Sequence, residues 1–115
     1  MTLRTVHDRV VGDTKEPLGA ILERDGVAVD LSAAEAVEFK MVRDDGTVVR
    51  DWTAGAFVDK SAGKVQFDFE AADVATAGIH WGWFRVGLGG EWDTFPVKGQ
   101  NFTARGFRIA INAAS

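Results

Sequence analysis

Glycine is the residue that most constrains this chain, because thirteen glycines and only two prolines are distributed along its 115 residues. Several glycines fall in pairs suited to tight turns. Asp25-Gly26 and Asp45-Gly46 match two-residue hairpin loops, in which both central positions need a positive φ. Ser61-Ala62-Gly63 and Gly89-Gly90 are two further turn signals. This spacing predicts many short strands joined by tight turns.

Between these turns the apolar residues recur with a period of two. Val37, Phe39 and Met41 alternate with Glu38 and Lys40, which is typical of a half-buried strand. Three other segments share this period, with apolar residues at Leu18, Ala20 and Leu22, at Val65, Phe67 and Phe69, and at Phe107, Ile109 and Ile111. We expect these side chains to face the core.

The segment 79–88 changes its apolar parity midway. Ile79, Trp81 and Trp83 share one face of a strand, whereas Phe84 begins a run of apolar residues on the opposite face. A β-bulge near Trp83 and Phe84 would reconcile the two halves, because one extra residue reverses which face points inward. A strand buried on both faces is the alternative.

Helical signals are confined to about one turn each. Ser32 and Glu35 have capping-box spacing, and the alanine-rich segment 70–77 precedes Gly78, which would end a helix. The sequence therefore predicts an all-β, two-sheet antiparallel β-sandwich of about seven to nine short strands, with one or two single-turn helices. We expect a single domain over residues 1–115, with a core over about 3–111 and a frayed tail at 112–115.

Charge and composition exclude several classes of partner. Thirteen Lys and Arg oppose seventeen Asp and Glu, which gives a net charge of −4, and no basic cluster suggests nucleic-acid binding. Cysteine is absent, so neither disulfides nor thiolate metal sites are expected. No apolar run resembles a secretion signal or a membrane span, and we expect synthesis in the cytoplasm without membrane contact.

Candidates for catalysis and for metal or cofactor binding are weak. His7 and His80 have no convergent partners, and the acidic residues near turns lack calcium-loop spacing. Glu91 and Asp93 share a strand face, but a solvated edge explains them better than a glycosidase pair. The sequence predicts no catalytic residue, no metal and no cofactor. An enzyme would need a pocket that combines His80 with Glu91 or Asp93.

Four tryptophans are many for a chain of this size. Exposed tryptophans on a sheet stack on sugars or anchor protein partners. We expect at least two of the four to lie in the core, with Trp81 and Trp83 on the same side, and Trp52 and Trp92 to be the better candidates for exposure. All four remain candidate interaction residues.

The order of these markers resembles a known family. Gly12-Asp13 before Pro17-Leu18, Val29-Asp30-Leu31-Ser32, the alternation over 37–41, Ala62-Gly63-Lys64-Val65, Thr76-Ala77-Gly78 and Thr94-Phe95-Pro96 are similar to the N-terminal domain of phage baseplate upper proteins. The likeness runs from about Val10 to Ile111. The tryptophan-rich segment 79–84 departs from the family pattern.

The resemblance implies an immunoglobulin-like module of a phage or prophage particle, located in the virion, in its tail, baseplate or head. Its partners would be other virion or tail subunits or further copies of itself, and it would have no catalytic residues. The rival hypothesis is a carbohydrate- or receptor-binding module that uses Trp52 or Trp92 as a stacking surface.

Overall fold

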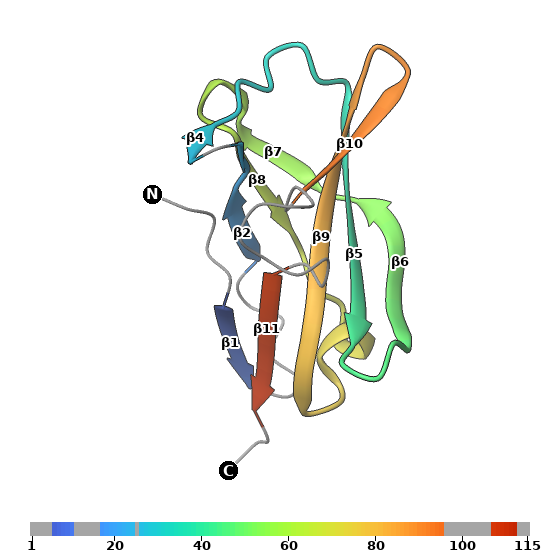
Figure 1. Cartoon of the computed structure of the whole chain (residues 1–115). Coiled ribbons are helices and arrows are strands. Elements are labelled where there is room, and N and C mark those ends of the chain that lie inside the picture. Colours follow the sequence, from blue (N-terminus) through green and yellow to red (C-terminus); the bar gives the residue numbers. More distant parts are fainter. Residues whose placement is uncertain (1–5, 11–16, 25, 96–106, 113–115) are drawn as a thin grey trace.

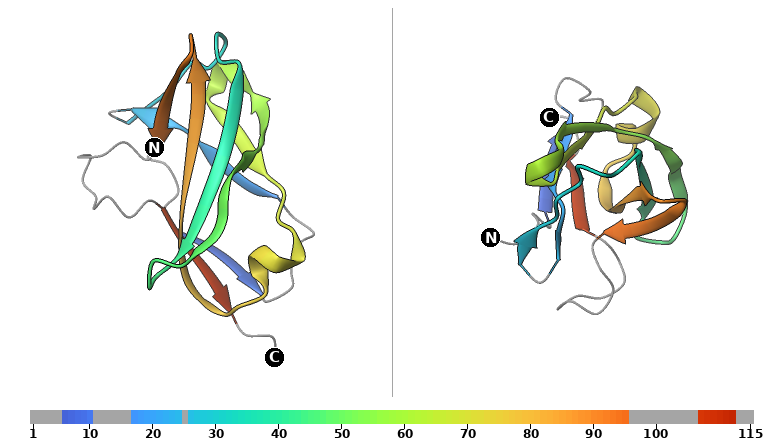
Figure 2. Two further views of the ribbon diagram at one scale, coloured as in Figure 1. Left: turned by 90° about the vertical axis from the view of Figure 1, so that its right-hand side faces the viewer. Right: turned by 90° about the horizontal axis from the view of Figure 1, so that it is seen from above.

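The computed structural model describes residues 6–10, 17–24, 26–95 and 107–112, and most of them lie in strands. A six-stranded sheet packs against a three-stranded sheet, and a two-stranded ribbon lies at one end (Figures 1 and 2). The strands of the large sheet are β1 (Val6–Val10), β5 (Ala36–Arg43), β6 (Val48–Ala54), β9 (Gly78–Leu88), β10 (Glu91–Phe95) and β11 (Phe107–Asn112). The small sheet contains β2 (Leu18–Ile21), β7 (Ala56–Asp59) and β8 (Lys64–Phe67), and the ribbon contains β3 (Glu23–Arg24) and β4 (Val27–Ala28). Two single 3-10 turns, η1 (Lys60–Ala62) and η2 (Ala71–Val74), complete the described elements.

The predicted antiparallel sandwich with single-turn helices is confirmed. Within the described ranges nine strands are longer than two residues, since β3 and β4 have only two residues each. Among the described strands every pair is antiparallel except β1 with β11, which is parallel and was not expected. The tail residues 113–115 lie outside the described residues.

Strand β9 organises the large sheet. It has eleven residues, of which 80–87 pair with β5 along one side, while on the other side β11 pairs with its first half and β10 with its second half. The sheet order is therefore β1-β11-β9-β5-β6, with β10 beside β9.

The predicted turns form where glycine permits a positive φ. Gly46 (φ 94°) lies in the β5–β6 hairpin, whose loop between Arg43 and Thr47 is longer than the two residues predicted, and Gly89 and Gly90 (φ 59° and 86°) form the two-residue loop between β9 and β10. Gly63 (φ 70°) follows η1 before β8. Gly26 lies at the tip of the ribbon, while Asp25 falls outside the described residues.

One of the two expected helical turns forms. The segment beginning at 70 contains η2, in which the Asp73 carboxylate accepts a hydrogen bond from the backbone N–H of Glu70 at 2.7 Å. The capping box at Ser32 was wrong, because Asp30 accepts hydrogen bonds from both the backbone and the hydroxyl of Ser32 and closes a local turn. The second observed turn, η1, was not expected.

The core lies between the two sheets and follows the period-two prediction. Phe39 of β5 lies at its centre, with ring centroids 4.6 Å from Phe67 and 5.0 Å from Phe84. Gly82 of β9 faces the same space, and a Cβ atom there would lie only 2.9 Å from the Phe39 ring. Other fully buried apolar side chains are Leu18, Leu22, Leu31, Met41, Val65, Val74, Phe95 and Ile109.

A buried ion pair connects the edge of the large sheet to η2. Arg50 of β6 donates from Nε and Nη2 to the Asp73 carboxylate at 2.8 and 3.0 Å, and Asp73 is only 1% exposed. These hydrogen bonds raise the pKa of Arg50 above its ordinary value. Since a buried carboxylate needs paired donors, Arg50 fixes η2 against the sheet.

Strand β9 contains no bulge in its pairing with β5. The register runs without interruption from Ala36 opposite Gly87 to Arg43 opposite His80. The inward residues are His80, Gly82, Phe84 and Val86, and the residues between them are half-buried on the outer face. The predicted bulge and the strand buried on both faces were therefore both wrong, because a buried histidine and a glycine occupy the inward positions before Phe84.

Candidate functional site

All four tryptophans lie on the outer face of the β6-β5-β9-β10 part of the large sheet. Trp81 and Trp83 occupy the outward positions of β9, and Trp92 of β10 is paired with the outward Gly87. Trp52 of β6 contacts the outward Lys40 and Arg85. We call this surface the tryptophan face; it consists of Glu38, Lys40, Trp52, Trp81, Trp83, Arg85 and Trp92.

None of the four tryptophans belongs to the core, contrary to the expectation of at least two. Trp92 is 45% exposed and the other three are half-buried. Trp81 and Trp83 do share one side, as predicted, but it is the outer side. The core is already filled by phenylalanine rings, which have no indole N–H that needs a partner.

An arginine lies between two of these rings. The Arg85 guanidinium carbon is 4.3 Å from the centroid of Trp52 and 4.2 Å from that of Trp92. Glu38, directly opposite on β5, accepts hydrogen bonds from Nε (2.7 Å) and Nη2 of Arg85. This charge-assisted pair fixes the guanidinium, so the aromatic and cationic groups are held in a defined arrangement.

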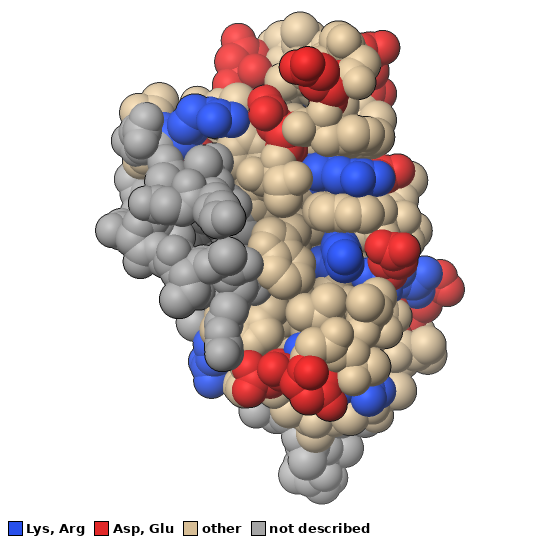
Figure 3. Space-filling view, turned by 45° about the vertical axis from the view of Figure 1, so that its right-hand side comes forward, with Lys and Arg blue, Asp and Glu red and all other residues tan. Residues whose placement is uncertain are grey.

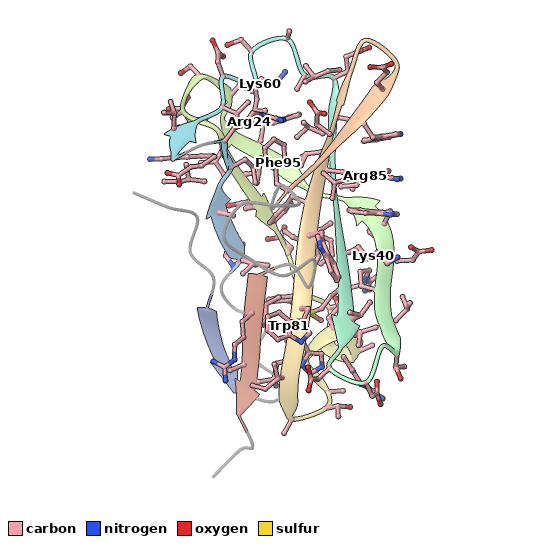
Figure 4. All side chains as sticks on the ribbon, in the orientation of Figure 1. Arg24, Lys40, Lys60, Trp81, Arg85 and Phe95 are labelled. Carbon is pink, nitrogen blue, oxygen red and sulfur yellow. The ribbon has the colours of Figure 1, made fainter. Side chains whose placement is uncertain are left out.

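Lys40 occupies the next outward position along β5. It lies directly opposite Trp83 of β9, and its Nζ is 5.9 Å from the ring centroid of Trp52 on the other side. Figure 4 shows Arg85, Lys40 and Trp81 following one another along this part of the sheet. Lys40 is half-buried and makes no ion pair with any residue in the described ranges.

At the end of the tryptophan face near Trp81, apolar side chains lie beside the Asp44 carboxylate. The Trp81 indole donates from Nε1 to the Asp44 carboxylate at 2.8 Å, so its polar atom is satisfied. Val42 and Val48, which are paired across β5 and β6, continue the apolar surface, and Val48 is 51% exposed. Figure 3 views the outer surface obliquely and shows basic side chains in its middle, separated by uncharged surface, with acidic side chains gathered mainly towards its ends.

The residues that an enzyme would need do not lie together in the structure. His80 is 1% exposed on the inner face, and its ring hydrogen-bonds through Nδ1 to the Gly78 carbonyl at 3.1 Å. Burial lowers the pKa of His80 below its ordinary value. Asp93 pairs with Val86, six residues along β9 from His80 and thus about 20 Å away. Asp93 instead forms an ion pair with Arg24 at 3.6 Å.

Acidic turn residues have structural roles in the described part of the chain. The Asp45 carboxylate accepts a hydrogen bond from the backbone N–H of Thr47, which lowers the pKa of Asp45. No group of three His, Cys, Asp or Glu side chains that could hold a metal ion occurs among the described residues. Asp8 and Asp13, which the sequence also places near turns, have no described side chains.

Three hollows are found in the described part of the chain, and the smallest, of about 260 Å³, is lined by Thr53, Ala54, Gly55, Ala56, Gln66, Phe67, Asp68 and Glu70. The other two are larger. One, of about 300 Å³, lies over the small sheet and is lined by Gly19, Ala20, Ile21, Val58, Lys64, Val65 and Gln66, which do not include a pair of titratable groups. The other, of about 320 Å³, lies beside His80, where Asp44 and Asp45 are already hydrogen-bonded. No helix in the described ranges is long and apolar enough to cross a membrane.

The sequence identified the tryptophans as candidates but missed the charged residues that organise them. Glu38 and Lys40 were interpreted only as the outward members of an alternating strand, and Arg85 was not singled out. The parity of β9 contained a usable signal, because Arg85 shares the outward positions of Trp81 and Trp83. The contacts with Trp52 and Trp92 depend on strand neighbours far apart in the sequence.

Comparison with known proteins identifies the fold. No family model matches the sequence, and no curated protein is similar to it at a significant level. A solved structure described as the N-terminal domain of phage TP901-1 ORF48 matches with a TM-score of 0.64 and 14% sequence identity, over 93% of this chain and 84% of that chain. This protein therefore has the fold of a phage protein domain along nearly its whole length.

Proposed function

We propose that this protein is a non-enzymatic structural module of a phage or prophage particle, in its tail, baseplate or head, and that it acts through protein–protein contacts. The observation that carries the proposal is the structural match to a phage protein domain over 93% of the chain. The order of turn and strand motifs, which resembles phage baseplate upper proteins, supports the same class of function.

The tryptophan face has the composition of a protein contact surface. Tryptophan and arginine are enriched at the centres of protein interfaces, where they account for much of the binding energy. Here Glu38 already holds Arg85 between Trp52 and Trp92, so a partner would meet a largely preorganised surface.

The β6 edge of the large sheet is less suited to binding a partner strand. The Asp51 carboxylate accepts a hydrogen bond from the backbone N–H of Trp52 at 2.9 Å, and the Thr53 hydroxyl donates to the Asp51 carbonyl at 2.8 Å. The β5–β6 register also shifts twice, between Phe39 and Met41 and between Met41 and Val42. Local capping and bulges protect an edge from strand addition, so the contacts would use the face of the sheet.

Carbohydrate binding is the second candidate, favoured by the 45% exposure of Trp92. Sugars stack on open ring faces, whereas Arg85 already covers one face of both Trp52 and Trp92. A glycan array tests this candidate directly. Affinity that disappears in Trp92→Ala, with unchanged thermal unfolding, would replace the assembly proposal.

The decisive experiment tests whether the protein is incorporated into phage particles. Particles from bacteria that carry the gene are separated on a density gradient, and the chain is detected with an antibody. We expect it in the particle fraction, including after a salt wash. Its confinement to the unassembled fraction would contradict the proposal. The variant Trp83→Ala/Trp92→Ala should lose incorporation, while Val58→Ala, at an exposed position of the small sheet, serves as the matched control.

A further inference from the structure

Lys40 is a cation without a counter-ion in the middle of the tryptophan face. Its neighbour Arg85 is hydrogen-bonded to Glu38, whereas Lys40 makes no ion pair with any residue in the described ranges. Lys40 is half-buried and lies between Trp83 on β9 and Trp52 on β6. A protein that covers this face would remove water from the ammonium group, which costs free energy unless the partner supplies a negative charge.

The charges around Lys40 favour one carboxylate rather than a polyanion. Arg85 and Glu38 are paired with each other, and the Trp81 indole binds the Asp44 carboxylate at one end of the face. A phosphate backbone needs clustered cations, and here it would meet these two acids beside the lone cation.

The rings on both sides of Lys40 add an apolar requirement. Trp83 and Trp52 flank it across the sheet, and Val42, paired with Trp81, is the next outward residue along β5. A segment with one Asp or Glu between apolar side chains complements both features. Its carboxylate would meet the ammonium group while its neighbours covered the indoles.

Among the described residues, the tryptophan face has no carboxylate to offer to the same face of a second copy. Glu38 and Asp44 are hydrogen-bonded as described, and Asp51 at the β6 edge accepts a hydrogen bond from the backbone of its own strand. Glu91 pairs with Leu88, which has the inward parity of β9, so its side chain lies on the side of β10 opposite to this face. A different protein therefore suits the face better than a two-fold contact.

We propose that the tryptophan face binds a segment of another protein in which a single Asp or Glu lies between apolar side chains, with its carboxylate paired to Lys40. This inference rests on the proposed function and states the chemistry of one partner.

The test uses the full chain to select from a displayed library of random peptides, and fluorescence anisotropy then measures the affinity of synthetic copies. We expect the selected peptides to contain one Asp or Glu beside apolar residues. Lys40→Glu should weaken their binding about tenfold or more, because it opposes two negative charges. Lys64→Glu, at an exposed position of β8, changes the net charge equally and should have little effect. Peptides with Lys in place of their acidic residue should prefer Lys40→Glu to the unchanged chain.

Each other result overturns the proposal. These results are a failure to select any peptide, selected peptides without an acidic residue, and equal loss of affinity in Lys40→Glu and Lys64→Glu. Binding of duplex DNA that Lys40→Glu abolishes would assign the face to a polyanion, and a dimer in sedimentation velocity that Lys40→Glu abolishes would assign it to a second copy. If thermal unfolding shows that Lys40→Glu does not fold, Lys40→Gln replaces it and should also weaken peptide binding.

Incorporation into particles separates this inference from the proposed function. If Lys40→Glu enters particles as well as the unchanged chain does, the carboxylate contact is refuted and the structural function stays intact. If the unchanged chain is absent from particles, the structural function is refuted, and the peptide measurements still decide whether the face binds a carboxylate.

Discussion

The two faces of the large sheet are built from alternate residues of the same strands, yet they have different aromatic chemistry. The inner face of β9 has His80, Gly82 and Phe84, and the outer face has Trp81, Trp83 and Arg85. Among the described residues five phenylalanines are buried in the core, whereas all four tryptophans lie outside it. Phenylalanine suits a dry core because it has no polar atom, while the indole N–H and large ring of tryptophan suit a surface shared with cations and carboxylates.

The faces also differ in how their contacts depend on shape. On the inner side, Gly82 leaves the space that the Phe39 ring fills. On the outer side, the Trp52–Arg85–Trp92 stack borders solvent and can relax when one member is lost. We therefore expect substitutions on the inner face to change stability and substitutions on the outer face to change binding.

The largest expected effect is from Phe39→Ala. Removing this ring should lower the free energy of unfolding by about 3–5 kcal/mol, because it leaves a cavity among Phe67, Phe69 and Phe84. Urea denaturation measures the change. A loss below about 1 kcal/mol would show that the inner face repacks as freely as the outer face is expected to.

Gly82→Ala tests the packing of the inner face by adding atoms to the core instead of removing them. The new methyl group would lie 2.9 Å from Phe39 Cε1 and 3.1 Å from Ile109 Cδ1, and overpacking of this kind should cost about 1–3 kcal/mol. Gly19→Ala is the matched control, since a Cβ there meets nothing within 4 Å. Equal thermal midpoints for the two variants would contradict the tight fit between Gly82 and Phe39.

Trp92→Ala is the corresponding change on the outer face. Loss of its contact with Arg85 should lower the free energy of unfolding by only about 0.5–1 kcal/mol, because the ring is partly exposed and Glu38 still holds the arginine. The same variant should weaken assembly. Destabilisation as large as that of Phe39→Ala would mean that the tryptophan face is structural.

The smallest expected effect is a pH dependence from His80. Its pKa in the folded state is lowered by burial, so the unfolded state binds more protons once the pH falls below about 6.5. Stability should be complete above that pH and decline until the pH passes below the folded-state pKa. His80→Asn retains a donor for the Gly78 carbonyl and should flatten the slope below about pH 6.5. If the slope of stability against pH is unchanged in His80→Asn, titratable groups other than His80 cause it.

Patterns of neighbouring residues were sufficient to predict most of the strands. The alternation at 37–41 predicted β5 and its buried side chains, and the Asp45-Gly46 and Gly89-Gly90 pairs predicted their hairpins, because both features depend on residues next to one another. The same logic failed at Ser32, where the nearby Asp30 provides a competing hydrogen-bond acceptor.

The site was predicted only in its residue types. Counting tryptophans indicated an interaction surface, and strand parity placed Trp81 and Trp83 on one side, but parity cannot tell which side is the core. That choice depended on volume: Phe39 needs the space beside Gly82, so the even-numbered residues of β9 face inward.

The sequence by itself determined that this protein is a β-sandwich, where its hairpins turn and which residues share a face, because turn geometry and the two-residue period are local properties. Only the tertiary structure decided which face is buried, that Arg85 lies between Trp52 and Trp92, and that Lys40 has no counter-ion in the described structure. These features join β5, β6, β9 and β10. Their contacts arise from strand order and register, which no stretch of neighbouring residues specifies.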